Sequence, residues 1–199
     1  MTEPVQPAAA STSSPPVVLV LMGVSGSGKT TIANALIERL GWEFEEGDNL
    51  HPKANRDKMA AGIPLTDDDR WPWLQKISDW VRQTLSDGHS GIITCSALRQ
   101  AYRDKLRGDG VLFVFLHGSR ELIAGRLSHR QGHFMPASLL GSQFGTLEIP
   151  TDESDVLTIE LGGTPEQETD RTLDALRRKG IEAPTTGPLP DDRAASGPA

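Results

Sequence analysis

A glycine-rich segment near the start of the chain carries residues that can bind a polyphosphate. It reads Gly23-x-x-x-x-Gly28-Lys29-Thr30, which is a complete Walker A pattern. In this pattern the backbone N–H groups surround the phosphates, the lysine reaches the β- and γ-phosphates, and the threonine hydroxyl ligates Mg²⁺. We therefore predict Lys29 as a catalytic residue, Thr30 as a metal ligand, and a nucleotide-binding loop that consists of Gly23, Val24, Ser25, Gly26, Ser27, Gly28, Lys29, Thr30 and Thr31.

The sequence on either side of this loop fits the same interpretation. Residues 17–22 form a short apolar run, typical of a buried parallel strand. After the loop, Ile32, Leu36 and Leu40 recur at helical spacing, and Gly41 suits the C-cap. A glycine-rich turn that binds nothing is the alternative, but strand, loop and helix stand in the order that phosphate binding requires.

One acidic residue follows the next expected strand. Residues 43–46 form a weak strand pattern, and Asp48 comes two positions later. At the strand end, facing the phosphate loop, a carboxylate can accept the proton of a substrate hydroxyl that attacks the γ-phosphate. The local sequence supports equally an aspartate that caps the next helix or makes a turn.

Two arginines in a polar segment suit an anionic substrate. A guanidinium matches the two oxygens of a carboxylate, and Arg56 and Arg70 are therefore candidates to hold one. The three aspartates at residues 67–69 have a simpler interpretation, as the cap and first-turn acids of a helix expected at 71–87.

Polar residues also follow the strand expected at 91–95. Ser96 comes directly after it. Arg99 and Arg103 stand four positions apart, which places them on one face of a helix expected at 98–107. We interpret these residues as further substrate contacts, and a solvated basic face is the alternative for the two arginines.

Two more arginines, Arg126 and Arg130, belong to a helix expected at 119–130. On a mobile segment such residues close over a nucleotide and neutralise the charge on the transferred phosphoryl group. His129 and His133 have metal-ligand spacing, but the glutamate of a His-Glu-x-x-His site is absent, and we expect no zinc site there.

The order of elements predicts the fold. Apolar runs predict strands at residues 17–22, 43–46, 91–95, 111–116 and 156–161. Further helical patterns lie at 71–87, 98–107, 119–130, from Pro136 onward, and at 165–179. Strands that alternate with helices imply a parallel sheet covered on both faces, which is the three-layer α/β/α architecture of P-loop NTPases. Ligands of such sheets bind beyond the carboxyl ends of the strands.

The composition sets further limits. The chain has 199 residues, a formal net charge of −7 and one cysteine, Cys95. This charge argues against nucleic-acid and membrane-surface partners, and we find neither a membrane span nor a secretory signal. A lone cysteine fits a cytoplasmic protein, and we expect Cys95 to be buried rather than nucleophilic. Residues 1–16 and 183–199 are expected to be disordered tails around one domain at residues 17–182.

Longer segments are more specific than the Walker A pattern. They are Gly47-Asp48-x-Leu50-His51-Pro52 with its continuation through Leu74, Cys95-Ser96-Ala97-Leu98-Arg99-x-x-Tyr102-Arg103, and Gly132-His133-Phe134-Met135-Pro136 with Ser142-Gln143-Phe144. With the Walker A segment, they resemble the gluconokinases of the small P-loop kinase type, which are related to shikimate and adenylate kinases.

The resemblance implies phosphorylation of D-gluconate on its 6-hydroxyl, with ATP and Mg²⁺ as cofactors. It also implies a small-molecule kinase domain with a mobile LID at about residues 120–150, and often a homodimer. The substrate contacts that it implies are Asp48, Arg56, Arg70, Ser96, Arg99, Arg103, His133 and Gln143.

Three rival functions remain open. A GTP switch lacks support because the chain has neither Asn-Lys-x-Asp nor Asp-x-x-Gly. The others are a kinase of a different small acceptor, such as shikimate or a nucleoside, and a nucleotide-binding module without catalysis. Intact Lys29, Thr30 and Asp48 argue against the last. No Walker B acid follows the strand at 91–95, so metal binding is expected to rest on Thr30, water and the nucleotide, with Asp48 nearby.

Overall fold

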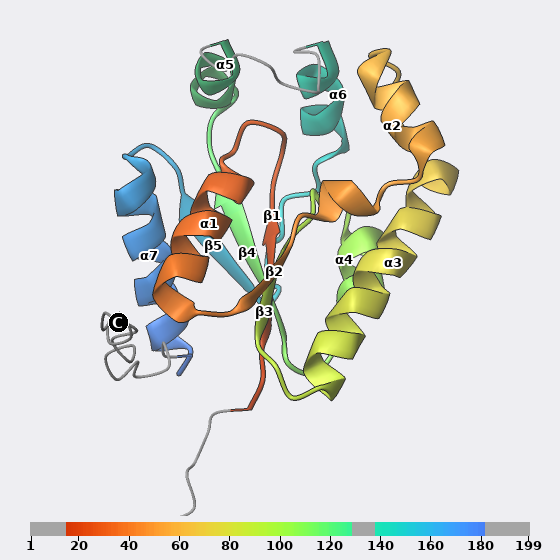
Figure 1. The fold of residues 1–199 in the computed structure, drawn as a ribbon. Helices are drawn as coiled ribbons and strands as arrows, with labels where there is room; N and C mark the ends of the chain where they lie inside the picture. Colours follow the sequence, from red (N-terminus) through yellow and green to blue (C-terminus); the bar gives the residue numbers. More distant parts are fainter. Residues whose placement is uncertain (1–14, 129–137, 182–199) are drawn as a thin grey trace, which may run out of the picture.

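The computed structural model describes residues 15–128 and 138–181. Its centre is a sheet of five parallel strands in the order β2-β3-β1-β4-β5 (Figure 1). The strands are β1 (Val18–Met22), β2 (Glu43–Glu45), β3 (Gly91–Thr94), β4 (Val111–His117) and β5 (Val156–Glu160). Each one ends within about one residue of the bounds expected from the apolar runs, so the predicted α/β architecture is confirmed.

Helices cover both faces of this sheet (Figure 1). They are α1 (Lys29–Leu40), α2 (Lys53–Ala60), α3 (Asp67–Ser86), α4 (Gln100–Leu106), α5 (Arg120–Ser128), α6 (Ser138–Thr146) and α7 (Pro165–Arg178), with a short 3-10 helix, η1 (Gly47–Leu50). Helices α1 and α7 pack on one face, and α3 and α4 pack on the other. Helices α5 and α6 lie beyond the ends of the strands, over the phosphate loop (Figure 1).

The alternation of side chains along β1 explains the two faces. Val18 and Val20 join a core cluster with α3 and α4, whereas Leu19 and Leu21 join one with α1 and α7. All five residues of β1 are buried, as in a central strand covered on both sides. The phosphate loop therefore follows a strand that is buried on both faces of the sheet.

Helix α3 begins four residues earlier than the apolar spacing predicts. Thr66 is its N-cap, and Thr66 and Asp69 form a reciprocal capping box. The side-chain oxygen of Thr66 accepts from the Asp69 N–H, while the Asp69 carboxylate accepts from the Thr66 N–H at 2.9 Å. The aspartates at 67–69 are thus first-turn acids, as expected. The N-cap is Thr66, however, and not one of these three aspartates.

Three other helical elements differ from the expectation in ways that matter for the site. Helix α2 and η1 were not anticipated, because their short polar sequences carry no clear apolar period. Helix α4 begins at Gln100 rather than 98, and Arg99 is its N-cap in an extended conformation.

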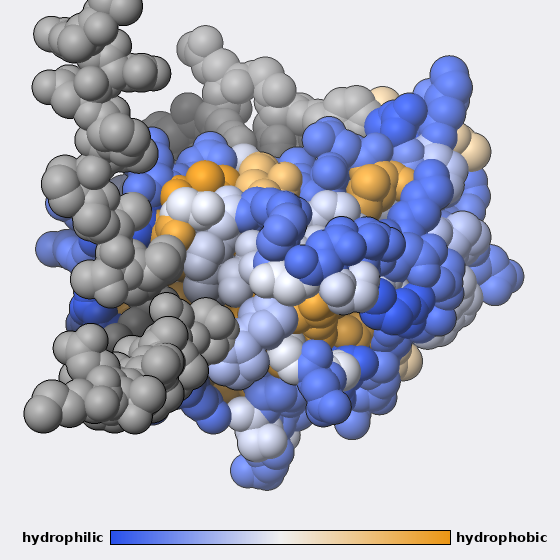
Figure 2. Space-filling view, turned by 60° about the horizontal axis from the view of Figure 1, so that its bottom comes forward, coloured by the Kyte–Doolittle hydropathy of each residue, from blue (hydrophilic) through white to orange (hydrophobic). Residues whose placement is uncertain are grey.

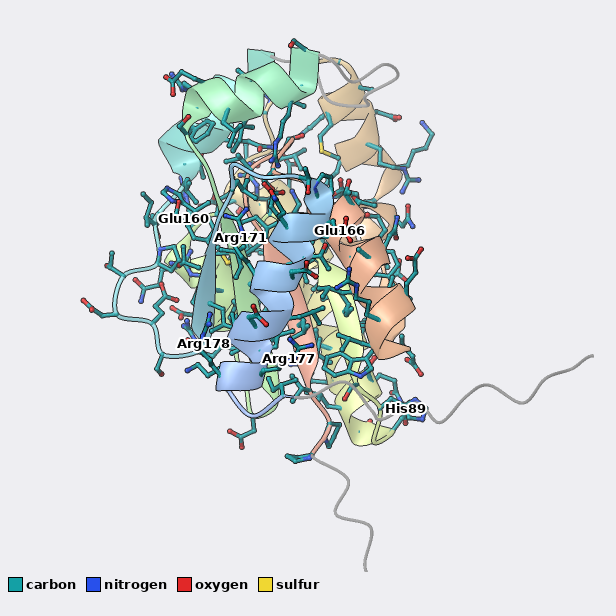
Figure 3. The ribbon with its side chains drawn as sticks, turned by 90° about the vertical axis from the view of Figure 1, so that its left-hand side faces the viewer. His89, Glu160, Glu166, Arg171, Arg177 and Arg178 are labelled. Atoms are coloured by element: carbon teal, nitrogen blue, oxygen red, sulfur yellow. The ribbon has the colours of Figure 1, made fainter. Side chains whose placement is uncertain are left out.

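The surface away from the phosphate loop is largely hydrophilic. Figure 2 looks at the end where the strands begin and shows apolar residues only as small separate areas on the described surface. Figure 3 shows the outer side of α7, where Glu166, Arg171, Arg177 and Arg178 are exposed. None of the described helices is long and apolar enough to span a membrane.

Candidate active site

The phosphate loop has the backbone conformation that its glycines allow. Gly23, Gly26 and Gly28 have φ angles of 139°, 83° and 95°, which residues with a Cβ rarely adopt. A Cβ on Gly26 would also come within 2.6 Å of Leu127. The Lys29 ammonium donates to the carbonyls of Gly23 at 3.0 Å and Val24 at 3.2 Å, so the lysine lies across the loop. The loop is therefore shaped to surround an anion.

A carboxylate that the sequence analysis missed touches the predicted metal ligand. The hydroxyl of Thr30 donates to Glu46 Oε2 at 2.8 Å, and Thr94 donates to the other oxygen of Glu46. We looked for such an acid after β3, whereas it stands directly after β2. The signal was present, since Glu46 is an acidic residue at the carboxyl end of an expected strand.

Asp48 is held at the sheet edge by the glycine that precedes it. A Cβ on Gly47 would lie 1.9 Å from the Thr94 carbonyl, so only glycine fits there. The Gly47 N–H donates to Thr94 Oγ1 at 3.0 Å, and the Trp73 indole donates to the Gly47 carbonyl at 2.7 Å. Asp48 lies in η1, whose backbone these contacts fix.

One cavity brings together several of the predicted site residues. Lys29 and Asp48 both line it, as do Arg70 from α3 and Ser96 from the end of β3. Among the other described residues that line it are Ser25, His51, Trp73 and Gln143. A phosphate-binding lysine, a carboxylate and a guanidinium therefore share one space at the carboxyl edge of the sheet.

Arg70 is oriented toward this cavity by its neighbours. Its Nη1 donates to the Tyr102 hydroxyl at 3.4 Å and lies 3.7 Å from Asp67. Arg99 donates to the other Asp67 oxygen at 2.6 Å, so Asp67 connects the two arginines. Arg56 donates to the carbonyl of His51. Arg99 and Arg56 thus contact groups around the cavity and are not among its lining residues.

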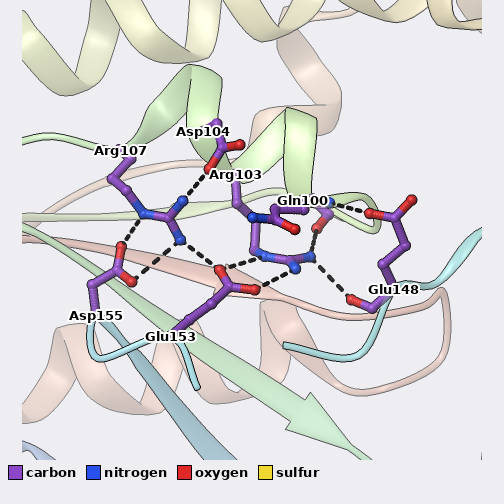
Figure 4. A network of polar contacts seen from close by, with 8 residues as sticks. Gln100, Arg103, Asp104, Arg107, Glu148, Glu153 and Asp155 are labelled. Atoms are coloured by element: carbon purple, nitrogen blue, oxygen red, sulfur yellow. Dashed lines mark hydrogen bonds and ion pairs between the residues drawn. The ribbon is translucent and has the colours of Figure 1, made fainter. Parts of the chain in front are cut away.

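Arg103 corrects the predicted substrate site. It is 1% exposed, and its Nη2 and Nε bind the two carboxylate oxygens of Glu153 at 2.5 and 3.0 Å (Figure 4). Its Nη1 donates to the carbonyls of Ala97 at 3.3 Å and Glu148 at 3.1 Å. The expectation was wrong because α4 begins after Arg99, so the two arginines do not share a helix face. Arg103 ties α4 to the segment that follows α6.

Arg126 lies on the other side of the phosphate loop. It donates to both carboxylate oxygens of Glu168, at 2.5 and 3.2 Å, and to the Ser27 carbonyl at 3.4 Å. Burial is the largest single influence on Glu168 and opposes its ionisation, but Arg126 and the N–H groups of Gly162 and Gly163 together outweigh it and lower the pKa of this carboxyl. Together with Thr31 and Pro165, Arg126 and Glu168 line a second cavity of about 320 Å³ beside the loop.

Helix α6 contributes directly to the loop. The side-chain carbonyl of Gln143 accepts a 2.6 Å hydrogen bond from the Ser25 N–H. Gln143 is thus placed where the phosphate loop and the first cavity meet. The other residues predicted on this segment, His129, Arg130 and His133, lie outside the described residues.

Cys95 is inert, as expected. It is 1% exposed at the end of β3, and burial raises the pKa of its thiol to about 12. A thiol with such a pKa does not supply a nucleophile at neutral pH.

Comparison with known proteins agrees with this geometry. The family described as an AAA domain matches residues 18–146. A gluconokinase of Gluconobacter oxydans is 54% identical over 146 residues, which cover 72% of this chain and 82% of that protein. The unliganded crystal structure of a sugar kinase from Janibacter sp. HTCC2649 is 47% identical, with a TM-score of 0.77 over 84% of this chain and 99% of that one.

A crystal structure of a gluconokinase from Sinorhizobium meliloti 1021 is similar to the same extent. It is 45% identical and covers 83% of this chain and 94% of its own, with a TM-score of 0.76. The region that matches the family model contains the phosphate loop, Glu46, Asp48 and Arg70. The chain belongs to the gluconokinase family.

Proposed function

We propose that this protein transfers the γ-phosphoryl group of ATP to the 6-hydroxyl of D-gluconate and so makes 6-phospho-D-gluconate. The observation that carries the proposal is that Lys29 and Asp48 line one cavity together with Arg70. This arrangement supplies charge stabilisation for a phosphate, a base for a hydroxyl and a partner for a carboxylate. Membership of the gluconokinase family supports gluconate as the acceptor.

The residues of the loop fit a nucleotide. The hydroxyl of Ser27 is fully buried and has no hydrogen-bond partner in the described part of the chain, which leaves it available to a phosphate oxygen. The second cavity, between Arg126 and Pro165, has room for the base and ribose. Thr30 and Glu46 would hold Mg²⁺, since hydroxyl and carboxylate oxygens are the ligands that this ion prefers. When bound, Mg²⁺ neutralises charge on the phosphates.

Asp48 takes the proton of the 6-hydroxyl as its oxygen attacks the γ-phosphorus. The new bond joins this oxygen to phosphorus, and the bond to the bridging oxygen of ATP breaks to release ADP. Lys29 stabilises the charge that develops on the transferred group. Arg126 and Arg130 are proposed to close over the nucleotide from the LID at about residues 120–150.

The acceptor is proposed to lie with its carboxylate toward Arg70. Ser96 and Gln143 line the same cavity and offer hydrogen bonds to hydroxyl groups of the sugar acid. Arg56 and Arg99 would act indirectly, because Arg56 donates to the carbonyl of His51 and Arg99 donates to the carboxylate of Asp67. His133 remains a proposed acceptor contact on the segment outside the described residues.

An acceptor panel tests the proposal. Purified protein with ATP and Mg²⁺ is assayed for ADP release with D-gluconate, other sugar acids, shikimate and nucleosides. We expect gluconate to be phosphorylated well above the rest, and we expect Lys29→Ala to lower turnover about 100- to 1,000-fold. Lys105→Met, an exposed lysine of α4, is the control and should match the parent. Turnover of another acceptor alone would overturn the assignment of gluconate.

The remaining expectations concern assembly and location. We propose a cytoplasmic homodimer with disordered tails at residues 1–16 and 183–199. Light scattering after gel filtration measures the mass of the assembly directly. A mass equal to one chain of 21.5 kDa would reject the dimer.

A further inference from the structure

A histidine that has no assigned role lines the acceptor cavity. His51 follows η1, is 4% exposed, and contributes to the same cavity wall as Asp48 and Arg70. Its ring stacks on the Trp73 indole with centroids 4.1 Å apart and planes 14° from parallel. Since Trp73 is itself fixed by its hydrogen bond to Gly47, the plane of the imidazole is fixed as well.

The hydrogen bonds of Asn55 determine which ring nitrogen of His51 carries the proton. Asn55 is buried, and its amide nitrogen donates to the backbone carbonyl of Asp69 at 2.7 Å. A carbonyl accepts only, so the atom at this position must be the NH₂ group. The same NH₂ group lies 3.3 Å from His51 Nδ1. Its second hydrogen points to that nitrogen, which must therefore hold a lone pair, and the single proton of the neutral ring is on Nε2.

The charges around His51 also oppose a second proton. The pKa of His51 is lowered to about 4. Burial of the ring contributes most to this lowering, followed by the positive charges of Arg70, Arg56 and Lys76. Asp48 and Lys29 are the other charged groups along the described wall of the cavity. The Asp69 carboxylate is engaged by Lys58 at 2.7 Å, and it is the carbonyl of Asp69 that Asn55 contacts.

We propose that His51 is a binding residue for the acceptor, and that its neutral imidazole donates from Nε2 to one oxygen of the sugar acid, with Asn55 holding the tautomer. This inference rests on the proposed function, because it assigns a residue to that acceptor site. Within the described residues, Nε2 has no hydrogen-bond partner, so its proton is available to a ligand.

A neutral donor gives this wall a specific chemistry. Arg70 supplies the positive charge for the carboxylate, whereas His51 supplies a directional hydrogen bond without a second charge. Such a donor suits a hydroxyl group, and it penalises an acceptor that lacks an oxygen at that position. The proposed preference for a polyhydroxy acid over a simple carboxylate follows from this pair.

Steady-state kinetics of His51→Phe provide the first test. Phenylalanine keeps a flat ring against Trp73 and removes both nitrogens, so we expect the KM for gluconate to rise roughly 10- to 100-fold while the KM for ATP stays within about 2-fold. His51→Gln restores a neutral N–H donor and should recover part of the loss. His89→Phe, at the end of the molecule away from α5 and α6, is the matched control (Figure 3).

The tautomer is tested directly by NMR of the full-length protein labelled with ¹⁵N-histidine. We expect the signals of His51, assigned by their loss in His51→Phe, to show a protonated Nε2 and an unprotonated Nδ1 from pH 6 to 8. In Asn55→Asp the new carboxylate accepts from Nδ1, so Nε2 donates only when the ring is cationic. The KM for gluconate should then rise with pH in this variant and show no such rise in the parent.

The outcomes separate this inference from the proposed function. If the parent phosphorylates gluconate but His51→Phe keeps its KM, His51 does not bind the acceptor and the inference is wrong, while the proposed function stands. A proton on Nδ1 of His51 in the parent would overturn the role of Asn55. If the parent does not phosphorylate gluconate at all, the proposed function fails, and the inference fails with it.

Discussion

The hydroxyl of Thr30 donates a 2.8 Å hydrogen bond to the carboxylate of Glu46. Thr30 stands in the first turn of α1, and Glu46 directly follows β2 at the edge of the sheet, so the contact joins the start of α1 to the end of the strand that comes next in the chain. Two oxygen ligands of the kind that Mg²⁺ prefers therefore meet beside the phosphate loop. We propose that this pair holds the metal ion, a role that the sequence analysis gave to Thr30 with water and the nucleotide.

Replacement of this carboxylate should weaken metal use more than nucleotide binding. For Glu46→Gln we expect the Mg²⁺ concentration at half-maximal rate to rise about 10- to 100-fold. The stabilisation of the protein by ADP, followed by thermal melting, should also lose most of its dependence on Mg²⁺. Glu45→Gln, one position earlier in the chain, is the matched control. An unchanged Mg²⁺ dependence in Glu46→Gln would remove this residue from the metal site.

Asp48 is expected to act on the rate of transfer. Asp48→Asn keeps the size of the side chain and removes the base, so kcat should fall about 100- to 10,000-fold while the KM for ATP changes little. Initial rates at saturating gluconate measure this effect. Asp109→Asn, an exposed aspartate before β4, should behave as the parent. A variant at position 48 with normal kcat would show that another group takes the proton.

Arg103 is expected to act on stability and not on the substrate. Its guanidinium is buried and binds Glu153, and it also donates to the carbonyls of Ala97 and Glu148. Arg103→Met leaves those carbonyls without this donor and leaves Glu153 with Arg107 as its remaining partner, so it should lower the free energy of unfolding by about 2–3 kcal/mol. Urea denaturation measures this loss. The exposed pair of Arg82 and Asp79 is the control, and Arg82→Met should cost less than about 1 kcal/mol.

Two further observations would decide the role of Arg103. Adding Glu153→Leu to Arg103→Met should recover part of the stability, because it removes a carboxylate that has lost one of its two arginine partners. At a temperature where the single variant is folded, the KM for gluconate should equal that of the parent. A large increase in KM would return Arg103 to the acceptor site.

The burial of His51 predicts a pH dependence of stability. Its pKa is about 4 in the folded protein and 6.5 in the unfolded chain. Between these values the unfolded chain binds a proton at His51 that the folded protein does not, so stability is lost as the pH falls from 6.5 to 4. The loss amounts to about 3 kcal/mol.

Urea denaturation at several pH values measures this dependence. As the pH is lowered from 6.5 to 4, the unfolding free energy of the parent should fall relative to that of His51→Phe, which has no imidazole to protonate. Parallel curves for the two proteins would mean that His51 titrates normally in the fold.

The sequence by itself determined the local chemistry. A strand, a glycine-rich loop and a helix follow one another at residues 18–40, and the loop residues that surround a phosphate are adjacent in the chain. Apolar runs likewise determined where the other strands lie, because burial on both faces of a sheet requires such runs. The position of Asp48 at the sheet edge followed from the same rule, since ligands bind beyond the carboxyl ends of parallel strands.

The tertiary structure decided which side chains meet. Glu46 reaches Thr30 only because β2 lies in the sheet beside β3, and alternation of strands and helices does not specify that order. Arg103 binds Glu153, 50 residues away, whereas Arg99 is the extended N-cap of α4, so the two arginines do not share a helix face. Side-chain partners across long stretches of chain depend on packing that the local sequence does not encode.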